Sequence, residues 1–508
     1  MIENKATLAR KIGFWAGLIG FFAILFFVDL EPGKPQVTAT LAVSILMAVW
    51  WLTEAIPIPA TSLLPVALFP ILGIMDGKAV SSTYFNHIIF LFIGGFLVAI
   101  AMQKWNLHKR IAVKIVKIFG VSQSRILLGF MAASAFLSMW MSNTATTMMM
   151  VPIVMSVVYQ LEEVAGKEAV EKYATGLFLG LAYSSSIGGV ATLVGTPPNL
   201  VFAKIFKIVF PQGPDITFSD WMIFALPTSI VMFIVAYFLL YYMFKPKQKW
   251  NLDKKMFDDV EKELGPTTAE ERVVFILFVL MGLLWIFRKD MNIGNFHLPG
   301  WSRLFKNPKY FNDGTVAIFI SVLMFIIPAK NHKGQKILDW DAAKDLPWGI
   351  VLLFGGGFAL AEGFVKSGLS QWFANSLTGL VSLSPIVMIL LVSLFVSLLT
   401  QLTSNTATTQ ILLPVLAGSA VAAHINPLML MIPATMAASL AFMTPVATPP
   451  NAIVFCTSRV NMKDMLKAGL VLNIVGVLII TVMVYFIAER LLHIDFSQFP
   501  DWANYMGH

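Results

Sequence analysis

Charged residues are scarce in this chain of 508 residues, and so is cysteine. Asp, Glu, Lys and Arg together make up 13% of the sequence and hydrophobic residues 57%, whereas soluble domains carry about 25% charged residues. Because so little charge cannot cover a soluble surface, the composition excludes a water-soluble protein of this length. The single cysteine, Cys456, excludes an intramolecular disulfide. The net charge of +8 indicates basic cytoplasmic loops and no nucleic-acid partner.

Long hydrophobic runs predict an all-α polytopic membrane protein. They lie at 12–28, 37–56, 60–74, 87–103, 173–194, 217–244, 272–287, 315–328, 348–361, 428–446 and 465–487. At ~20 residues per crossing these runs give about eleven transmembrane helices. Their continuous apolarity favours helices over the alternating strands of a barrel. The first run is predicted to be a retained span with its amino end in the cytoplasm. Trp50, Trp51, Trp221 and Trp285 fit aromatic belts at the membrane surfaces.

Two further stretches are interrupted by polar residues at their centres. Residues 126–161 contain no charge, yet Ser142-Asn143-Thr144 lies midway; 367–458 is equally uncharged and contains Ser404-Asn405-Thr406. A polar break inside an over-long apolar run predicts two half-helices that meet at a tip. Such re-entrant hairpins are tolerated only where the tip is buried in protein or faces a watery cavity.

The interruptions belong to an internal repeat. Phe92-Ile-Gly-Gly-Phe96 matches Phe354-Gly-Gly-Gly-Phe358, and Ser142-Asn-Thr-Ala-Thr-Thr147 matches Ser404-Asn-Thr-Ala-Thr-Thr409, each 262 residues later. Gly195-Thr-Pro-Pro-Asn199 matches Ala447-Thr-Pro-Pro-Asn451, 252 residues later. Residues 104–125 hold six Lys or Arg and no acid, whereas the matching 366–387 holds only Lys366. The positive-inside rule places the two segments on opposite sides, which predicts an inverted-topology repeat, unless one copy simply lost its charges.

These features divide the chain into five predicted parts. They are an N-terminal region with the first helix (1–36), repeat 1 with a re-entrant hairpin at 125–159 (37–244), a cytoplasmic linker (245–271), repeat 2 with a re-entrant hairpin at 384–424 (272–490), and an extracytoplasmic tail (491–508). Residues 111–119 are predicted to form an amphipathic helix on the cytoplasmic surface. The glycine runs at 94–95 and 355–357 are predicted to permit close packing of helices.

The paired motifs suit the binding of an anion together with sodium. Thr196 and Thr448 fit helix N-caps and Pro197 and Pro449 fit the first helical position, so each pair is predicted to direct a half-helix amino end with free N–H groups inward. The asparagine and threonine of each tip add polar donors, and exposed carbonyl and hydroxyl oxygens there suit a small hard cation. None of the four motifs contains Arg or Lys.

Some of these residues also fit other roles. Serine, threonine and asparagine often only link transmembrane helices by hydrogen bonds. Glu54, Glu362, His87 and His424 lie near span ends and are interpreted as structural groups. An enzyme is not predicted, because the membrane segments offer no nucleophile or metal-ligand constellation, and no cofactor is expected. An ion channel seldom needs two helix breaks in each inverted half.

The ordered motifs resemble those of the divalent anion/sodium symporter family, which carries succinate, malate, 2-oxoglutarate and citrate. The resemblance covers 41–485 and rests on both Ser-Asn-Thr tips, both Thr-Pro breaks and Leu52-Thr-Glu-Ala-Ile-Pro57. It implies a homodimer and elevator-type alternating access, with a scaffold part that dimerises and a mobile transport part that carries the hairpins. It places one sodium ion at Ser138, Ser142, Asn143 and Gly195, and a second at Thr400, Thr403, Asn405 and Ala447, partly through backbone carbonyls. It places the substrate carboxylates at Asn143, Thr144, Thr196, Pro197, Asn405, Thr406, Thr448 and Pro449.

The resulting prediction is a secondary active transporter of C4–C5 dicarboxylates (succinate, malate, fumarate and 2-oxoglutarate) in the plasma membrane, with the N-terminus cytoplasmic and the C-terminus extracytoplasmic. Sodium symport is favoured because both oxygen-rich tips are intact. Sodium-independent exchange of one dicarboxylate for another stays open as the alternative. Citrate is a less favoured substrate, since no cationic group is visible for a third carboxylate. The expected partners are small dicarboxylates, membrane lipids and a second copy of the chain.

Overall fold

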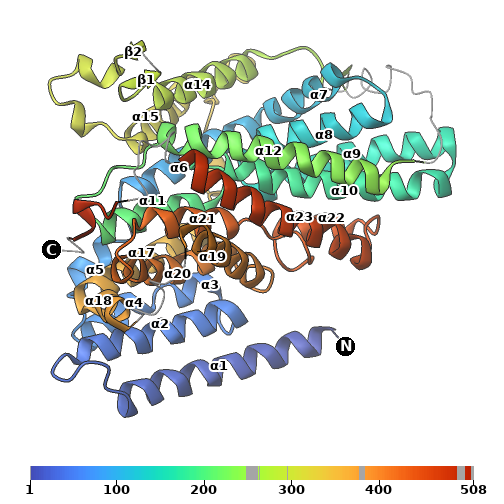
Figure 1. Ribbon diagram of the computed structural model, residues 1–508. Coiled ribbons are helices and arrows are strands. Elements are labelled where there is room, and N and C mark those ends of the chain that lie inside the picture. The colour runs from blue at the N-terminus through green and yellow to red at the C-terminus, as the bar shows by residue number, and fades with distance from the viewer. Residues whose placement is uncertain are drawn as a thin grey trace.

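The structure is a computed structural model that describes residues 2–246, 261–262, 264–293, 296–376, 384–488 and 498–504. Parts of the predicted linker and of the predicted C-terminal tail lie outside these ranges. Most of the described chain is helical, and Figure 1 shows long helices running side by side. The fold class expected from composition, an all-α polytopic membrane protein, is confirmed.

The elements of the first half are all helices. They are α1 (Ile2–Phe27), α2 (Pro35–Thr53), α3 (Ile58–Thr61), α4 (Leu64–Ile71), α5 (Gly77–Ser82), α6 (His87–Lys104), α7 (Leu107–Phe119), α8 (Gln123–Ser138), α9 (Asn143–Ala165), α10 (Lys167–Val190), α11 (Pro197–Val209) and α12 (Phe218–Phe244).

The second half adds one small antiparallel hairpin, β1 (Met291–Ile293) and β2 (Phe296–Leu298). Its α-helices are α14 (Ala269–Ile286), α15 (Asp313–Ile326), α16 (Trp340–Ala343), α17 (Trp348–Ser367), α18 (Leu369–Ser376), α19 (Pro385–Leu399), α20 (Asn405–Ala422), α21 (Leu428–Ala437), α22 (Pro449–Cys456) and α23 (Met462–Met483). Short turns of other helix types are η1 (Trp301–Leu304), η2 (Pro308–Tyr310), η4 (Val484–Ala488) and η5 (Asp501–Asn504).

Seven helical segments in the described residues are long and apolar enough to cross a membrane. They are Leu8–Phe27, Pro35–Thr53, Gly77–Lys104, Asn143–Ala165, Phe218–Phe244, Trp348–Ser367 and Met462–Ala488, and shorter apolar helices stand beside them. The run expected at 60–74 is divided between α3 and α4, and the run at 428–446 ends its helix at Ala437. A count of about eleven crossings therefore stays a prediction.

The polar interruptions are helix breaks at the expected places. In repeat 1, α8 ends at Ser138 and α9 begins at Asn143; in repeat 2, α19 ends at Leu399 and α20 begins at Asn405. The Thr-Pro-Pro motifs likewise begin α11 at Pro197 and α22 at Pro449. Proline fixes the backbone angle that the first helical residue needs, so both motifs restart a helix after an unwound loop. Re-entry into the bilayer and the division into five parts stay predictions.

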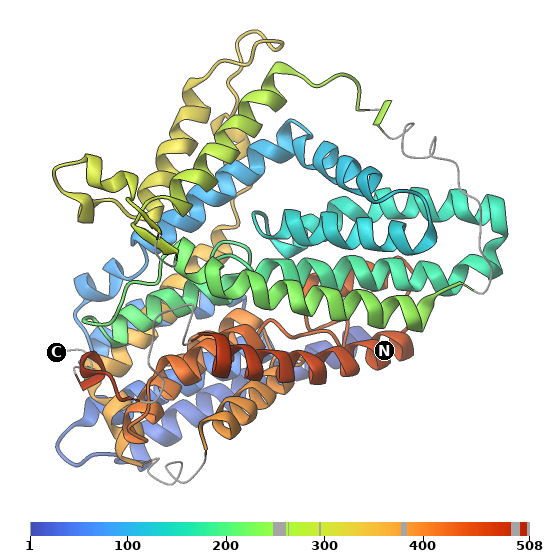
Figure 2. The same cartoon turned by 45° about the horizontal axis from the view of Figure 1, so that its top comes forward.

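Helices of the two halves pack across each other. The half-helix α11 of the first half lies against α20 of the second, while the half-helix α22 of the second half lies against α9 and α10 of the first. In Figure 2 the C-terminal helices accordingly run beside the long α9, α10 and α12 group. The helices that carry the paired motifs therefore form one interleaved body.

A smaller hydrophobic core lies to one side of this body. It is built by α1 to α5 together with α17 and α18, and α20 contributes Ala407 to it. The close-packing role expected for the glycine runs is confirmed here, because a Cβ on Gly356 of α17 would lie 2.4 Å from the carbonyl oxygen of Ser62. In the larger core, a Cβ on Gly94 of α6 would lie 2.5 Å from the Cβ of Ala317 in α15.

The prediction that four tryptophans lie in aromatic belts at the membrane surfaces is wrong. Trp51 and Trp221 are 2% exposed and Trp285 is 0% exposed, and Trp50 is also buried. Each indole nitrogen donates a hydrogen bond within the protein, as in Trp221 to the Val190 carbonyl at 2.9 Å. Hydropathy locates the end of a helix but does not say which face of that end meets another helix.

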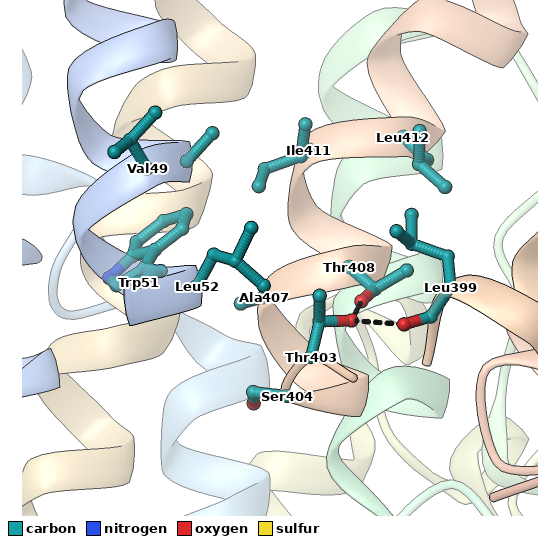
Figure 3. Close-up of a pocket in the computed structure, with 11 residues that line it drawn as sticks. Val49, Trp51, Leu52, Leu399, Thr403, Ser404, Ala407, Thr408, Ile411 and Leu412 are labelled. Atoms are coloured by element: carbon teal, nitrogen blue, oxygen red, sulfur yellow. Dashed lines mark hydrogen bonds between the residues drawn. The ribbon is translucent and has the colours of Figure 1, made fainter. Parts of the chain in front are cut away.

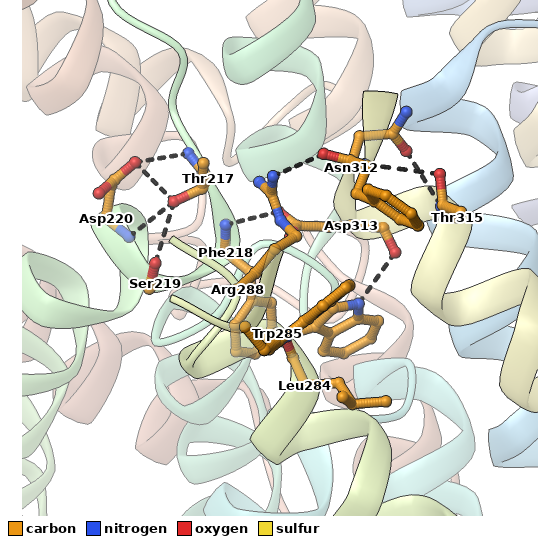
Figure 4. A network of polar contacts seen from close by, with 12 residues as sticks. Thr217, Phe218, Ser219, Asp220, Leu284, Trp285, Arg288, Asn312, Asp313 and Thr315 are labelled. Atoms are coloured by element: carbon orange, nitrogen blue, oxygen red, sulfur yellow. Dashed lines mark hydrogen bonds and ion pairs between the residues drawn. The ribbon is translucent and has the colours of Figure 1, made fainter. Parts of the chain in front are cut away.

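A buried ion pair joins α12, α14 and α15 (Figure 4). Arg288 Nε donates to Asp313 Oδ1 at 2.6 Å, and the other carboxylate oxygen accepts the backbone N–H of Phe218 at 2.9 Å. The indole N–H of Trp285 donates to the Asp313 carbonyl at 2.9 Å. Because a buried charge must be paired and hydrogen-bonded, this network fixes the start of α12 and the Trp285 ring relative to α15.

The amphipathic helix expected at 111–119 is present as α7. Val113 and Val116 are buried and Lys114 is exposed. Arg110 is buried as well, and its guanidinium pairs with Glu271 at 2.6 Å and donates to the Gly265 carbonyl at 3.1 Å. This pair fastens α7 to the start of α14.

Candidate functional site

Two asparagines hold the unwound loops that precede the half-helices. Asn199 Nδ2 donates to the carbonyl oxygens of Thr192 at 2.7 Å, Val190 at 3.1 Å and Gly189 at 3.3 Å. Its repeat counterpart, Asn451, donates to Thr444 and Ala441, each at 3.0 Å. Both side chains are 0% exposed. The last residue of each Thr-Pro-Pro-Asn motif therefore fixes its own loop and is not part of a surface that meets a solute.

The loops are also tied to the hairpin tips. Thr192 Oγ1 donates to the carbonyl of Met139 at 2.5 Å, and its counterpart Thr444 Oγ1 donates to the carbonyl of Gln401 at 3.3 Å. The Gln401 amide in turn bonds Leu440 O at 2.6 Å and accepts the N–H of Met443 at 3.0 Å. Each repeat thus builds a preorganised junction of one hairpin tip and one unwound loop.

In repeat 1 this junction gathers oxygen atoms around the Asn143 amide. Ser138 Oγ lies 2.6 Å from Asn143 Oδ1. With the amide turned over, its nitrogen donates to Ser138 Oγ at 2.6 Å and to the carbonyls of Gly195 and Ser185, each at 3.2 Å. With the amide oxygen turned inward, it accepts the Ser138 hydroxyl proton and faces the carbonyl oxygens of Gly195 and Ser185 without a proton between them. Such a set is what a hard cation requires, because hard cations prefer carbonyl, amide and hydroxyl oxygens.

Two glycines make this convergence sterically feasible. A Cβ on Gly189 would lie 2.4 Å from Asn143 Oδ1, and a Cβ on Gly195 would lie 2.5 Å from the Gly189 carbonyl oxygen and 2.9 Å from that of Ser138. Gly189 and Ser185 were not predicted as site residues. No spacing signal marks them, because they lie in the last turns of α10 and meet the tip only through packing.

Repeat 2 repeats the arrangement with other side chains. Thr400, the counterpart of Ser138, has its Oγ1 2.6 Å from Asn405 Oδ1 and 2.8 Å from the Ala438 carbonyl oxygen. A hydroxyl has one proton and can donate to only one of these acceptors. Ala447 is 6% exposed and takes the place of Gly195.

Thr403 departs from the set predicted for the second sodium site. Its hydroxyl bonds the Leu399 carbonyl at 3.0 Å and Thr408 Oγ1 at 2.5 Å, and Figure 3 shows the side chain on the wall of an apolar cavity. The structure therefore joins Thr400 and Asn405 by a hydrogen bond but turns the Thr403 hydroxyl elsewhere, so only its backbone carbonyl stays a candidate. Ser142, of the first set, accepts the Ala145 N–H at 3.1 Å and caps α9.

The candidate carboxylate ligands fall into two kinds. Asn143 and Thr144 begin α9 and Asn405 and Thr406 begin α20, so their backbone N–H groups lie in the first turn, where no helical acceptor exists. The half-helices α11 and α22 begin with two prolines each, which have no N–H. The expectation of free N–H groups at those two ends is therefore wrong for their first two positions. At those two ends, beside Pro197 and Pro449, only the helix dipole and the threonines Thr196 and Thr448 are left to attract a carboxylate.

Glu54 and His424, two of the other polar residues near the ends of the predicted spans, make contacts that stabilise the fold. Glu54 ends α2 in the left-handed region, with φ 47°, and pairs with Arg10 at 3.1 Å. The His424 ring stacks on Phe499 with ring centroids 4.3 Å apart. Among the residues that the structure describes, no group of three or more His, Cys, Asp or Glu side chains is placed to bind a metal ion.

Comparison with known proteins agrees with this architecture. The family described as "Sodium:sulfate symporter transmembrane region" matches residues 14–492. The chain is 42% identical over 508 residues to the "Sodium-dependent dicarboxylate transporter SdcS" of Staphylococcus saprophyticus, covering 98% of this chain and 95% of the relative. It is 43% identical over 507 residues to the protein of the same name from Staphylococcus aureus strain MRSA252, covering 98% and 94%.

A solved structure shares the fold. MtrF of Neisseria gonorrhoeae, described as illuminating a class of antimetabolite efflux pumps, aligns with a TM-score of 0.54 and 12% sequence identity, covering 88% of this chain and 94% of that chain. At this identity the likeness concerns the fold alone. The family matches residues across nearly the whole length, and the resemblance drawn from the paired motifs is thereby confirmed: the chain belongs to the sodium:sulfate symporter family of membrane transporters.

Proposed function

We propose that the protein is a sodium-coupled transporter of C4–C5 dicarboxylates. The observation that carries the proposal is the pair of oxygen clusters at matching positions of the repeat, Ser138 with Asn143 and Thr400 with Asn405, each at a break between two half-helices. The names of the two staphylococcal relatives support both the ion and the substrate class. Succinate, malate, fumarate and 2-oxoglutarate are the expected substrates.

One sodium ion is expected at each tip. The first takes its ligands from Ser138, Asn143 and the Gly195 carbonyl, and the second from Thr400, Asn405 and backbone carbonyls including that of Ala447. Ser142 and Thr403 add backbone oxygens at most, because their hydroxyls are engaged in caps and turns. An ion at either position would be bound by the amide oxygen together with the neighbouring hydroxyl and carbonyl oxygens.

The dicarboxylate is expected between the tips. Its carboxylates meet the first-turn N–H groups of α9 and α20, the side chains of Asn143, Thr144, Asn405 and Thr406, and the threonines and prolines that begin α11 and α22. A dianion in a site without Arg or Lys needs positive charge from elsewhere, since an unpaired charge in a dry site is very costly. The two sodium ions and the positive ends of four helices supply it. Ion and substrate therefore depend on each other, which is the physical basis of symport.

The transport cycle is expected to be of the elevator type in a homodimer. The interleaved body of α8 to α12 and α19 to α23 carries both tips and would move as one unit, while α1 to α6, α14, α15 and α17 would form the scaffold. Net charge in the 104–125 segment supports a cytoplasmic position for α7 and a plasma-membrane location with the N-terminus inside.

Uptake by purified protein in proteoliposomes tests the proposal. An inward sodium gradient is expected to drive accumulation of radiolabelled succinate, and an equal potassium gradient is not. Unlabelled malate, fumarate and 2-oxoglutarate are expected to compete, whereas citrate and sulfate compete weakly. Strong counterflow without sodium, together with no net uptake in its presence, would reject symport in favour of dicarboxylate exchange.

A further inference from the structure

The inverted repeat extends to helices outside the Ser-Asn-Thr motifs. Leu46-Met-Ala-Val-Trp-Trp-Leu52 in α2 matches Leu280-Met-Gly-Leu-Leu-Trp-Ile286 in α14, so Ala48 corresponds to Gly282 and Trp51 to Trp285. Both tryptophans are buried, and both indole nitrogens donate a hydrogen bond, from Trp51 to Ser62 Oγ at 3.1 Å and from Trp285 to the Asp313 carbonyl at 2.9 Å. The two helices therefore present equivalent surfaces to the two hairpins.

One of these surfaces is occupied by the tip of the first hairpin. The Trp140 ring stacks on Trp285 with centroids 6.5 Å apart and meets Phe278 edge-on at 5.0 Å. A Cβ on Gly282 would lie 3.4 Å from the same ring. Trp140 thus seats the α8–α9 tip on α14.

The corresponding residue of the second hairpin is not seated. By the 262-residue relation, Trp140 corresponds to Leu402, which is 77% exposed. The unwound loops differ in the same direction: Val194 is 6% exposed and lies against Gly95 of α6, whereas its counterpart Val446 is 91% exposed. At both pairs the repeat 1 residue is packed and the repeat 2 residue is not.

The matching surface on α2 borders a cavity instead of a packed ring. A space of about 210 Å³ lies between α2 and the second hairpin. Ala48, Trp51 and Leu52 line one wall, and Thr403, Ala407 and Ile411 are among the residues of the other (Figure 3). The position equivalent to that of Trp140 on α14 is therefore open on α2, and it borders Thr403, which follows the exposed Leu402 in the chain.

We infer that Leu402 is the residue that seats the second hairpin on α2 in the alternate state of the transporter, entering the cavity beside Ala48 and Trp51 as Trp140 now sits beside Gly282 and Trp285. Val446 turns toward α17 in the same movement, as Val194 now lies against α6. The inference rests on the proposed two-state transport cycle and identifies the residues that exchange packing partners between the two states. An inverted repeat makes this exchange the natural second state, because each half can adopt the packing of the other.

Apolar side chains such as Trp140 and Leu402 let the two states of the transporter have similar free energies. Seating Leu402 and releasing Trp140 are opposite changes in packing contact, so neither state gains a large excess of packing energy. If ion pairs made these contacts, oppositely charged side chains would have to be separated inside the membrane in every transport cycle, which is costly.

Cross-linking tests the inference with a matched pair of variants. In a Cys456→Ser parent, Leu402→Cys with Ala48→Cys and Trp140→Cys with Gly282→Cys are treated with a short bis-thiol reagent in proteoliposomes, and the linked product is read by mass spectrometry. Both pairs are expected to link. Linking through Leu402 is expected to increase under conditions that reduce linking through Trp140. Linking at Trp140 only, under every condition of sodium and succinate, would overturn the inference.

A kinetic comparison covers the case in which a cysteine variant does not fold. Leu402→Ser is expected to slow sodium-driven uptake roughly tenfold by destabilising the alternate state. Leu398→Ser, at a residue of α19 that is 51% exposed, is expected to leave uptake unchanged. Equal rates for both variants would contradict the role of Leu402. A parent that takes up no dicarboxylate would contradict the proposed function instead, and the cross-links, which are read without transport, would still report the packing exchange.

Discussion

Replacing Asn143 by alanine probes the first oxygen cluster directly. The amide lies 2.6 Å from Ser138 Oγ and, when turned over, 3.2 Å from the carbonyls of Gly195 and Ser185. Alanine removes one ligand of the expected sodium ion and leaves the other oxygens in place. A hydrogen bond or contact with a charged partner is worth about 1.5–3 kcal/mol, which corresponds to a roughly 10- to 150-fold higher sodium concentration for half-maximal uptake.

The assay is initial succinate uptake in proteoliposomes as a function of sodium concentration at fixed substrate. Asn461→Ala is the control, because Asn461 is an exposed asparagine that caps α23 far from the tips in sequence. Size-exclusion chromatography of both variants checks that the fold is kept. A sodium requirement for Asn143→Ala within twofold of the parent, with normal uptake, would refute the assignment of this cluster to sodium.

Three further predictions concern the second cluster, the loop and the packing. Asn405→Ala is expected to raise the sodium requirement in the same assay by a similar factor, and an unchanged requirement would remove the second ion from the proposal. Asn199→Leu leaves up to three buried carbonyls without their donor and is expected to lower stability by about 2–4 kcal/mol, measured as an earlier thermal unfolding transition; no shift would contradict the locking role. Gly188→Ala places a Cβ 2.1 Å from the Ala135 carbonyl oxygen and is expected to cost about 1–3 kcal/mol, whereas Gly20→Ala, where the nearest atom is 3.7 Å away, is expected to be neutral or slightly stabilising.

The helix breaks could be predicted from sequence because their causes are local. A Thr-Pro-Pro motif favours a helix start because proline fits the first helical position. A Ser-Asn-Thr motif marks a break because it interrupts an apolar run that is too long for one crossing. The starts of α9, α11, α20 and α22 follow from these motifs, and the repeat made each prediction twice.

What the sequence did not reveal depends on contacts between distant segments. Ser185 and Gly189 reach Asn143 only because α10 packs on the first hairpin, and no spacing rule connects them. The tryptophans were misplaced for the same reason, since burial of a helix end is decided by its neighbours. The Thr403 hydroxyl was wrongly assigned to an ion site because it donates a hydrogen bond to the Leu399 carbonyl one helical turn earlier. Such local bonds compete with the binding of an ion.

The crossed packing of α11 on α20 and of α22 on α9 has a consequence for how such a chain can arise and assemble. A single copy of the repeat, made alone, would expose the faces of its hairpin and half-helix that the other copy covers. An ancestral half-length chain would therefore have needed a sister molecule inserted in the opposite direction. Likewise, residues 1–246 and the remainder, expressed as two separate polypeptides, should regain a functional carrier only when both are present in the same membrane.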